Sequence, residues 1–173
     1  KSVSRNSAFS MINKGLSVVF PLVTVSYISR VLGAAGIGEV SSAQNLATYF
    51  SMAAALGIPS YGVRAIAQSK RDENSCNKTF SELFAINLIS SIIATVVYLI
   101  TVFCFKINNS NTALALIFSS IIVFNVINIE WVYQGYEEYE YIMIRSFVIK
   151  IVSLLLLFIF VRRKSDLVAY AFI

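Results

Sequence analysis

Several residue types that build catalytic centres are scarce or missing in this sequence. It contains no histidine, two cysteines and nine acidic residues in a chain of 173. Zinc sites and Ser-His-Asp triads draw on these side chains. Cys76 and Cys104 stand in different settings and form no disulfide or metal-binding pattern. We therefore expect no enzyme activity, no metal and no cofactor.

Charge is scarce as well. Charged residues make up 13% of the chain and apolar residues 57%, whereas about a quarter of an ordinary soluble domain is charged. A soluble chain of this length could not bury so much apolar surface, which makes lipid the expected solvent. The basic segment 64–78 is interrupted by Asp72 and Glu73. Membrane topology explains this segment better than a nucleic-acid partner does.

Five apolar stretches are long enough for membrane helices, which need about 20 residues each. Their runs are continuous rather than alternating, which excludes a membrane β-barrel. The tail 166–173 is apolar again and is interpreted as the start of a sixth helix, so the chain is expected to be incomplete. The fold class is thus an all-α membrane protein with about five transmembrane helices. The expected spans are residues 8–29, 40–58, 83–105, 112–131 and 142–161.

Basic residues flanking these spans favour a cytoplasmic N-terminus. With this orientation the cytoplasmic side receives six of them and the opposite side five, and the bias is clearest in the first loops. The cytoplasmic set is Lys1, Arg5, Arg64, Lys70, Arg71 and Lys78, and the opposite set is Arg30, Lys106, Arg162, Arg163 and Lys164.

Charges inside the expected spans point to function. An ionisable side chain at membrane depth costs about 2.5–3.5 kcal/mol on insertion scales, so it normally faces protein or water. Lys14 lies within the first span, and Arg145 and Lys150 enter the fifth. Glu130 closes the fourth span, at a depth similar to that of Arg145, and we expect these two residues to pair. Lys14 and Lys150 have no obvious acidic partner, which favours an anionic ligand in a water-filled cavity.

Simpler explanations exist for several of these residues. Arg30, Arg64 and Arg145 can extend their side chains to the lipid headgroups. The glycine-rich segment Gly33–Gly38 follows a membrane helix rather than a strand, so it is no phosphate-binding fingerprint. We expect a tight turn outside the membrane at this segment.

The order of several short motifs resembles the opening part of the bacterial O-antigen and capsular polysaccharide flippases. The resemblance covers the whole chain, and the ordered set is more specific than any single motif. The superfamily also contains the multidrug and toxin extrusion (MATE) transporters and the peptidoglycan lipid flippases. The motifs are Ser29–Gly33, Gly36–Glu39, Ala47–Ser51, Leu56–Pro59, Tyr61–Arg64, Phe80–Leu83, Glu130–Gly135, Tyr141–Ser146 and Ile149–Ile151.

This resemblance implies the N-terminal lobe of a MATE-like transporter with two lobes around a cationic cavity. It implies movement of undecaprenyl-pyrophosphate-linked oligosaccharide repeat units across the bacterial cytoplasmic membrane by alternating access. The implied partners are this substrate, membrane lipids, and the polysaccharide polymerase and chain-length machinery. Lys14, Arg30, Arg145 and Lys150 are the candidates for lining the cavity, Lys14 on depth alone. Arg64 and Glu130 are candidates for a gate or a structural ion pair.

Three other functional classes would require different features from those of a flippase. A drug or metabolite exporter of the same superfamily would place acidic coupling residues in the spans, and almost none are present. A membrane-embedded polymerase would need a long catalytic loop, and every loop here is short. A non-transporting scaffold would tolerate loss of the buried lysines.

Overall fold

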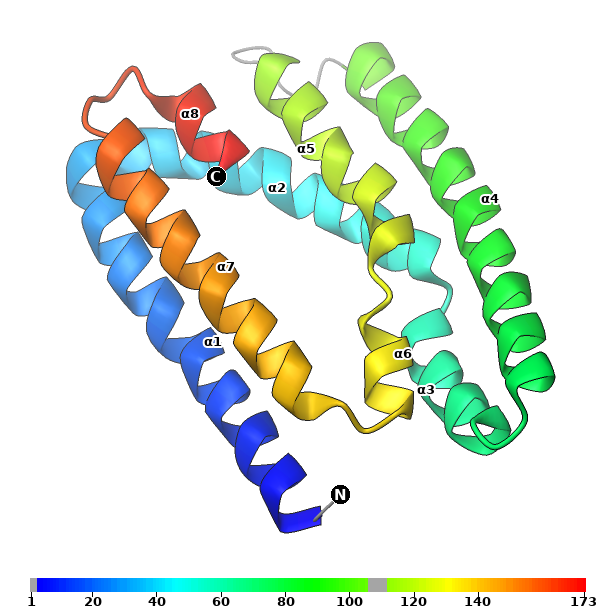
Figure 1. Ribbon diagram of the computed structural model, residues 1–173. Helices are drawn as coiled ribbons and strands as arrows, with labels where there is room; N and C mark the ends of the chain where they lie inside the picture. Colours follow the sequence, from blue (N-terminus) through cyan, green and yellow to red (C-terminus); the bar gives the residue numbers. More distant parts are fainter. Residues whose placement is uncertain (1–2, 106–111) are drawn as a thin grey trace. The chain divides into compact units, whose positions relative to one another are not determined.

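A computed structural model describes residues 3–105 and 112–173, so Lys1 and Lys106 of the orientation argument lie outside the described residues. Within this part every regular element is a helix, which confirms the expected all-α class (Figure 1). Among the described residues six elements are longer helices and three are short. They are α1 (Val3–Val31), α2 (Gly33–Ala55), α3 (Ile58–Ser69), α4 (Glu73–Phe105), α5 (Thr112–Phe124), the 3₁₀ turn η1 (Asn125–Ile127), α6 (Glu130–Gly135), α7 (Tyr139–Phe160) and α8 (Leu167–Phe172).

Four segments of the described chain are long and apolar enough to cross a membrane. They are Phe9–Val31, Glu73–Cys104, Thr112–Gly135 and Tyr139–Phe160. The helix α2 covers most of the second expected span but is not among the four. Polar residues such as Gln44, Asn45 and Thr48 lower its hydropathy. Hydropathy alone therefore does not mark α2 as a membrane span.

The chain divides into two compact units, and each is described by itself. The first combines the residues up to Ser41 with Glu138–Ile173. In this unit α1 and α7 lie side by side (Figure 1). Their contacts advance in the same direction along both helices, from Ser17–Lys150 to Tyr27–Val161. The helices α1 and α7 are therefore parallel.

The glycine-rich segment after α1 is helical, so the expected tight turn over Gly33–Gly38 is wrong in its extent. Only Leu32 separates α1 from α2, and Gly33 has a positive φ of 72°. Gly36 lies inside α2, where a Cβ would come within 3.1 Å of the Leu167 side chain. This glycine serves close packing of α2 against α8 rather than chain reversal.

The second unit comprises the described residues of Ser42–Glu137, in which α4 packs on both α3 and α5. Two helical rods in this unit are broken. Leu56 and Gly57 adopt positive φ between α2 and α3, and η1 interrupts the rod between α5 and α6. Side chains of α4 bind the backbone at both breaks. The Ser90 hydroxyl donates to the Ala54 carbonyl at 2.6 Å, and the Asn87 amide donates to the Asn125 carbonyl at 3.4 Å.

These contacts have a physical reason. Carbonyls in the last turn of a helix have no intrahelical donor, and at membrane depth water is not available to replace one. The Ser90 hydroxyl supplies such a donor to the Ala54 carbonyl. The Asn87 amide adds a second hydrogen bond to the Asn125 carbonyl, which also accepts from the backbone N–H of Asn128 at 3.2 Å. Helix α4 thus supports two discontinuous neighbours at once.

Candidate functional site

The first candidate site lies along the parallel pair α1 and α7. The Lys150 ammonium donates to the Ser17 hydroxyl at 2.8 Å. Ser17 stands eight residues into the candidate span that begins at Phe9, which is about 12 Å along the helix. The contact is therefore well inside the membrane-crossing part of both helices.

Pro21 gives this position a further polar feature. It is inside α1 and has no backbone N–H to donate to the carbonyl of Ser17, four residues earlier. A broken helical ladder at membrane depth is tolerated where other groups or water satisfy the backbone. Lys150 thus reaches α1 at the turn where the helix itself is less well satisfied.

Helical rise places two more of the predicted cations at a similar depth. Lys14 lies three residues before Ser17 on α1, about 4.5 Å lower, and Arg145 lies five residues before Lys150 on α7, about 7.5 Å lower. Because the helices are parallel, these offsets have the same direction. Lys14 is exposed, whereas Arg145 and Lys150 are half-buried. Three of the four predicted cavity residues therefore lie within about 7.5 Å of one another along the helix axes of the first unit.

Arg30 does not join this group. It lies in the last turn of α1, thirteen residues and about 20 Å beyond Ser17. The nearest level on α7 is its C-terminal end, where the Tyr27 hydroxyl donates to the Val161 carbonyl at 2.8 Å. Arg30 is exposed there, which fits the alternative explanation of a side chain that extends to the headgroups.

The predicted gate residues Arg64 and Glu130 lie in the second unit. Arg64 is exposed on α3, two residues after Gly62 and hence on the opposite side of the helix from the α6 contact. Glu130 begins α6, is half-buried and accepts a hydrogen bond from the Gln134 amide at 3.2 Å. No ion pair joins Arg64 to Glu130 within the described residues. The pairing of Glu130 with Arg145 remains a prediction, because the two residues belong to different units.

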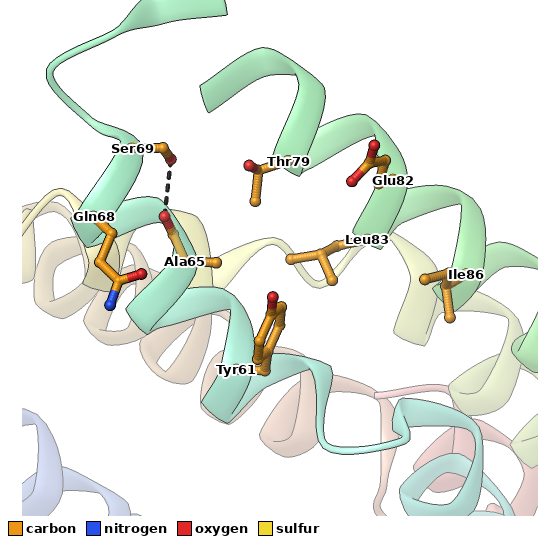
Figure 2. A pocket seen from close by; sticks show the side chains of 8 residues that line it. All are labelled: Tyr61, Ala65, Gln68, Ser69, Thr79, Glu82, Leu83 and Ile86. Carbon is orange, nitrogen blue, oxygen red and sulfur yellow. Dashed lines mark hydrogen bonds between the residues drawn. The ribbon is translucent and has the colours of Figure 1, made fainter. Parts of the chain in front are cut away.

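The second candidate site is a groove of about 450 Å³ between α3 and α4 (Figure 2). Aromatic, amide, hydroxyl and carboxylate side chains line it together with aliphatic ones. In Figure 2 the ring of Tyr61 rises between the helices, and Thr79 and Leu83 project toward α3. The lining residues are Tyr61, Ala65, Gln68, Ser69, Thr79, Glu82, Leu83 and Ile86.

The groove adjoins a closely packed core. On the other side of α3, the ring of Trp131 packs over Gly62, and Ile66 packs against Gly135. Phe80 of α4 stacks on Trp131 with ring centroids 5.9 Å apart. Gly62, Phe80, Trp131 and Gly135 belong to the motifs Tyr61–Arg64, Phe80–Leu83 and Glu130–Gly135 quoted for the family resemblance. Their packing gives those motifs a structural reason.

Sequence analysis missed both the groove and the role of Ser17. The second expected span ends at residue 58, although Ile58, Gly62 and Ile66 recur every four residues beyond that point. That period marks the buried face of α3 and would have indicated a helix. For Ser17 the available signal was Pro21, because a proline identifies the carbonyl four residues earlier as an unmatched acceptor.

No group of three metal-ligating side chains is present in the parts of the chain that the structure describes. Neither candidate site is therefore built around a cluster of acidic or sulfur ligands. The first offers cations at membrane depth, and the second offers neutral polar groups with one carboxylate.

Comparison with known proteins places the chain in context. The model of the family described as "Polysaccharide biosynthesis protein" matches residues 3–173. A protein of Escherichia coli K12 named "Putative O-antigen transporter" is 28% identical over 99% of this chain and 41% of its own length. A protein of the same name from Shigella dysenteriae is 24% identical over 98% of this chain and 42% of its own length. The chain thus spans about two fifths of these relatives. No solved structure matches it.

Proposed function

Because the chain belongs to the polysaccharide biosynthesis protein family, we propose that the protein of which it forms part is a lipid-linked oligosaccharide flippase. Its substrate is an undecaprenyl-pyrophosphate-linked repeat unit, which it moves across the bacterial cytoplasmic membrane by alternating access. The chain contributes the N-terminal lobe, with its N-terminus in the cytoplasm. The polysaccharide polymerase and chain-length machinery then act on the exported units. The protein itself is not an enzyme.

One observation carries this proposal. Lys14 and Lys150 lie within about 4.5 Å of one level of the α1–α7 pair, and the Lys150 ammonium donates to the Ser17 hydroxyl inside the membrane-crossing segments. Several cations at this depth are costly unless an anion or water compensates them. A pyrophosphate has the charge to do so, and charge-assisted bonds from Lys and Arg are the usual way to hold it. Arg30 and Arg64 act at the two membrane surfaces, where they meet the headgroup before or after passage.

The test uses the full-length gene in a strain that lacks its own flippase, with export of surface polysaccharide as the readout. Lys150→Gln retains a donor for Ser17 but removes the charge, and we expect at least a tenfold loss of export. Lys150→Arg retains the charge and should restore a substantial part of it. The matched control is Lys164→Gln, which removes an exposed cation outside the α7 span.

The outcomes separate the competing functions. Normal export with both Lys14→Ala and Lys150→Gln would exclude the cationic cavity. Export that needs the protein but is indifferent to these lysines supports a scaffold. Drug resistance conferred by the gene without any effect on polysaccharide supports an exporter of the same superfamily.

A further inference from the structure

The groove between α3 and α4 changes character along its length. Helices α3 and α4 are joined by the short turn around Lys70–Asp72. Gln68 and Thr79 lie near this turn, whereas Tyr61 and Ile86 each lie seven residues further from it, about 10 Å along the helix axes. The end at the turn is thus lined by polar groups and the far end by apolar ones. This gradient is that of a site for an amphiphile.

The length of α4 places the polar end at the membrane surface. Its candidate span contains 32 residues, Glu73–Cys104, which corresponds to about 48 Å of helix. The hydrocarbon core of a bilayer is only about 30 Å thick. The first three turns carry all the charged residues of α4, Glu73, Lys78 and Glu82, so these turns lie among the headgroups. Glu82 and Thr79 therefore face water at the interface, and Ile86 faces the hydrocarbon.

The chemistry of the lining selects the kind of head group. The groove contains an aromatic ring that is 63% exposed (Tyr61), an amide (Gln68), two hydroxyls and the Glu82 carboxylate, and it has no lysine or arginine in its lining. Lys78, which does not line the groove, has its ammonium 4.0 Å from the Glu82 carboxylate, and both side chains are exposed. A carboxylate repels a phosphate, so this groove suits a neutral head group.

Neutral polyols match this lining. Sugar hydroxyls both donate and accept, so they can donate to a carboxylate and pair with an amide at the same time. An exposed aromatic ring offers an apolar face to the C–H groups of a sugar ring. The Ser69 and Thr79 hydroxyls donate to their own helices, at 2.8 and 2.9 Å, which leaves their oxygens as acceptors.

We infer that the α3–α4 groove is a saccharide-binding site, which holds sugar units of the lipid-linked substrate at the membrane surface. The inference rests on the proposed function and deepens it. Under the cytoplasmic orientation of the N-terminus, the groove faces the side on which the repeat unit is assembled. In this assignment the sugars contact Tyr61, Gln68 and Glu82 of the second unit.

The experiment measures binding directly, apart from transport. The full-length protein is placed in phosphatidylcholine nanodiscs and titrated with a radiolabelled farnesyl lactoside, a neutral glycolipid without phosphate. We expect the double variant Gln68→Leu/Glu82→Leu to raise the Kd at least tenfold. The matched control Asn77→Leu/Ser81→Leu changes two exposed residues near the same turn that do not line the groove, and it should remain within twofold of the wild type.

Thermal midpoints of all variants in the same nanodiscs show whether each is folded, and Tyr61→Phe provides a milder variant that keeps the ring. Equal Kd values for the wild type and a folded double variant would overturn the inference. So would displacement of the probe by phosphatidylethanolamine, because the groove would then hold a lipid head group. Complementation of the flippase-deficient strain is scored separately. Restored export with unchanged probe binding in the double variant refutes the groove alone, whereas no export by the wild type refutes the proposed function.

Discussion

The indole ring of Trp131 occupies the space that a side chain at position 62 would need. A Cβ built on Gly62 would lie 2.8 Å from Trp131 Cδ2 and still closer to Trp131 Cε3. Both residues are buried, in the core that joins α3, α4 and α6. Only glycine allows α3 to approach α6 this closely, so the position of α3, and with it one wall of the groove, depends on this contact.

Replacement of Gly62 by alanine should therefore destabilise the protein. Overpacking a well-packed core typically costs about 1–3 kcal/mol, which exceeds the roughly 1 kcal/mol that alanine gains over glycine inside a helix. A lower thermal midpoint of the full-length protein in detergent is the expected result. Gly38→Ala is the matched control, because a Cβ there meets no atom within 4 Å, and it should leave the midpoint equal or higher.

Gly135 also has no room for a side chain, one turn further along the contact between α3 and α6. A Cβ at this position would lie 2.8 Å from both Cβ and Cγ2 of Ile66. Gly135→Ala should thus lower the thermal midpoint, and Ile66→Ala should lower it through a cavity that costs about 2–5 kcal/mol. The change Ile66→Ala removes Cγ2 and so relieves part of the clash. The free energy of unfolding lost in the double variant should therefore be smaller than the sum of the losses in the two single variants. Strict additivity would show that the two residues do not compete for space.

Loss of the Ser90 hydroxyl should destabilise the backbone at the break between α2 and α3. Ser90→Ala leaves the Ala54 carbonyl without its donor, at a cost of about 1–3 kcal/mol for a buried acceptor. Hydrogen exchange of the amides around Leu56–Ile58, measured in nanodiscs, should accelerate in the variant. Thr101→Ala is the control, since the Thr101 hydroxyl donates to Val97 of its own helix. Equal acceleration in both variants would assign the effect to α4 and not to the break.

The turn between α3 and α4 should respond to acid. The hydroxyl of Ser75 and the backbone N–H groups of Asn74 and Ser75 stabilise the Asp72 carboxylate, which lowers its pKa below the ordinary value of 3.8. A carboxyl with a lowered pKa in the folded state contributes stability above that ordinary value and loses it as the pH falls through the lowered pKa. Asp72→Ala should therefore lower the thermal midpoint at neutral pH, and its difference from the wild type should shrink progressively below pH 3.8.

A difference between wild type and Asp72→Ala that stays constant down to the most acidic measurable pH would contradict this explanation. The variant Asp166→Ala is a useful comparison. Asp166 accepts hydrogen bonds from the backbone N–H groups of Arg162 and Arg163, at 3.0 and 2.8 Å, and its pKa is lowered for that reason. The stability that Asp166 contributes beyond the C-terminal end of α7 should therefore also be lost as the pH falls.

The sequence was sufficient for the fold class, because long apolar runs leave few alternatives to membrane helices. It also singles out Lys14 and Lys150 as cations at membrane depth, and it sets Arg30 apart, sixteen residues and about 24 Å along α1 from Lys14. It does not show which level of α7 lies beside each of them, because the pairing of α1 with α7 is a long-range contact that no local pattern encodes.

The breaks in two helical rods were harder to predict for a different reason. Apolar content continues through Asn125–Ile127, and nothing in hydropathy distinguishes a 3₁₀ turn from an α-helix. At the other break, Gly57 and Pro59 signalled the end of a helix but not the start of α3, which begins at Ile58 with the proline in its first turn. Donors on α4, such as Asn87, become meaningful only once the neighbouring carbonyls are known.

The parallel arrangement of α1 and α7 has a consequence for counting membrane crossings. Two parallel spanning helices start on the same face of the bilayer, so the chain between them must return and cross an odd number of times. Hydropathy supplies two crossings in that interval, α4 and the α5–α6 rod. The third crossing is then α2 with its continuation α3, which are not among the candidate spans identified by hydropathy. By this parity rule, the turn at Lys70–Asp72 lies on the same face as the N-terminus, whichever face that is.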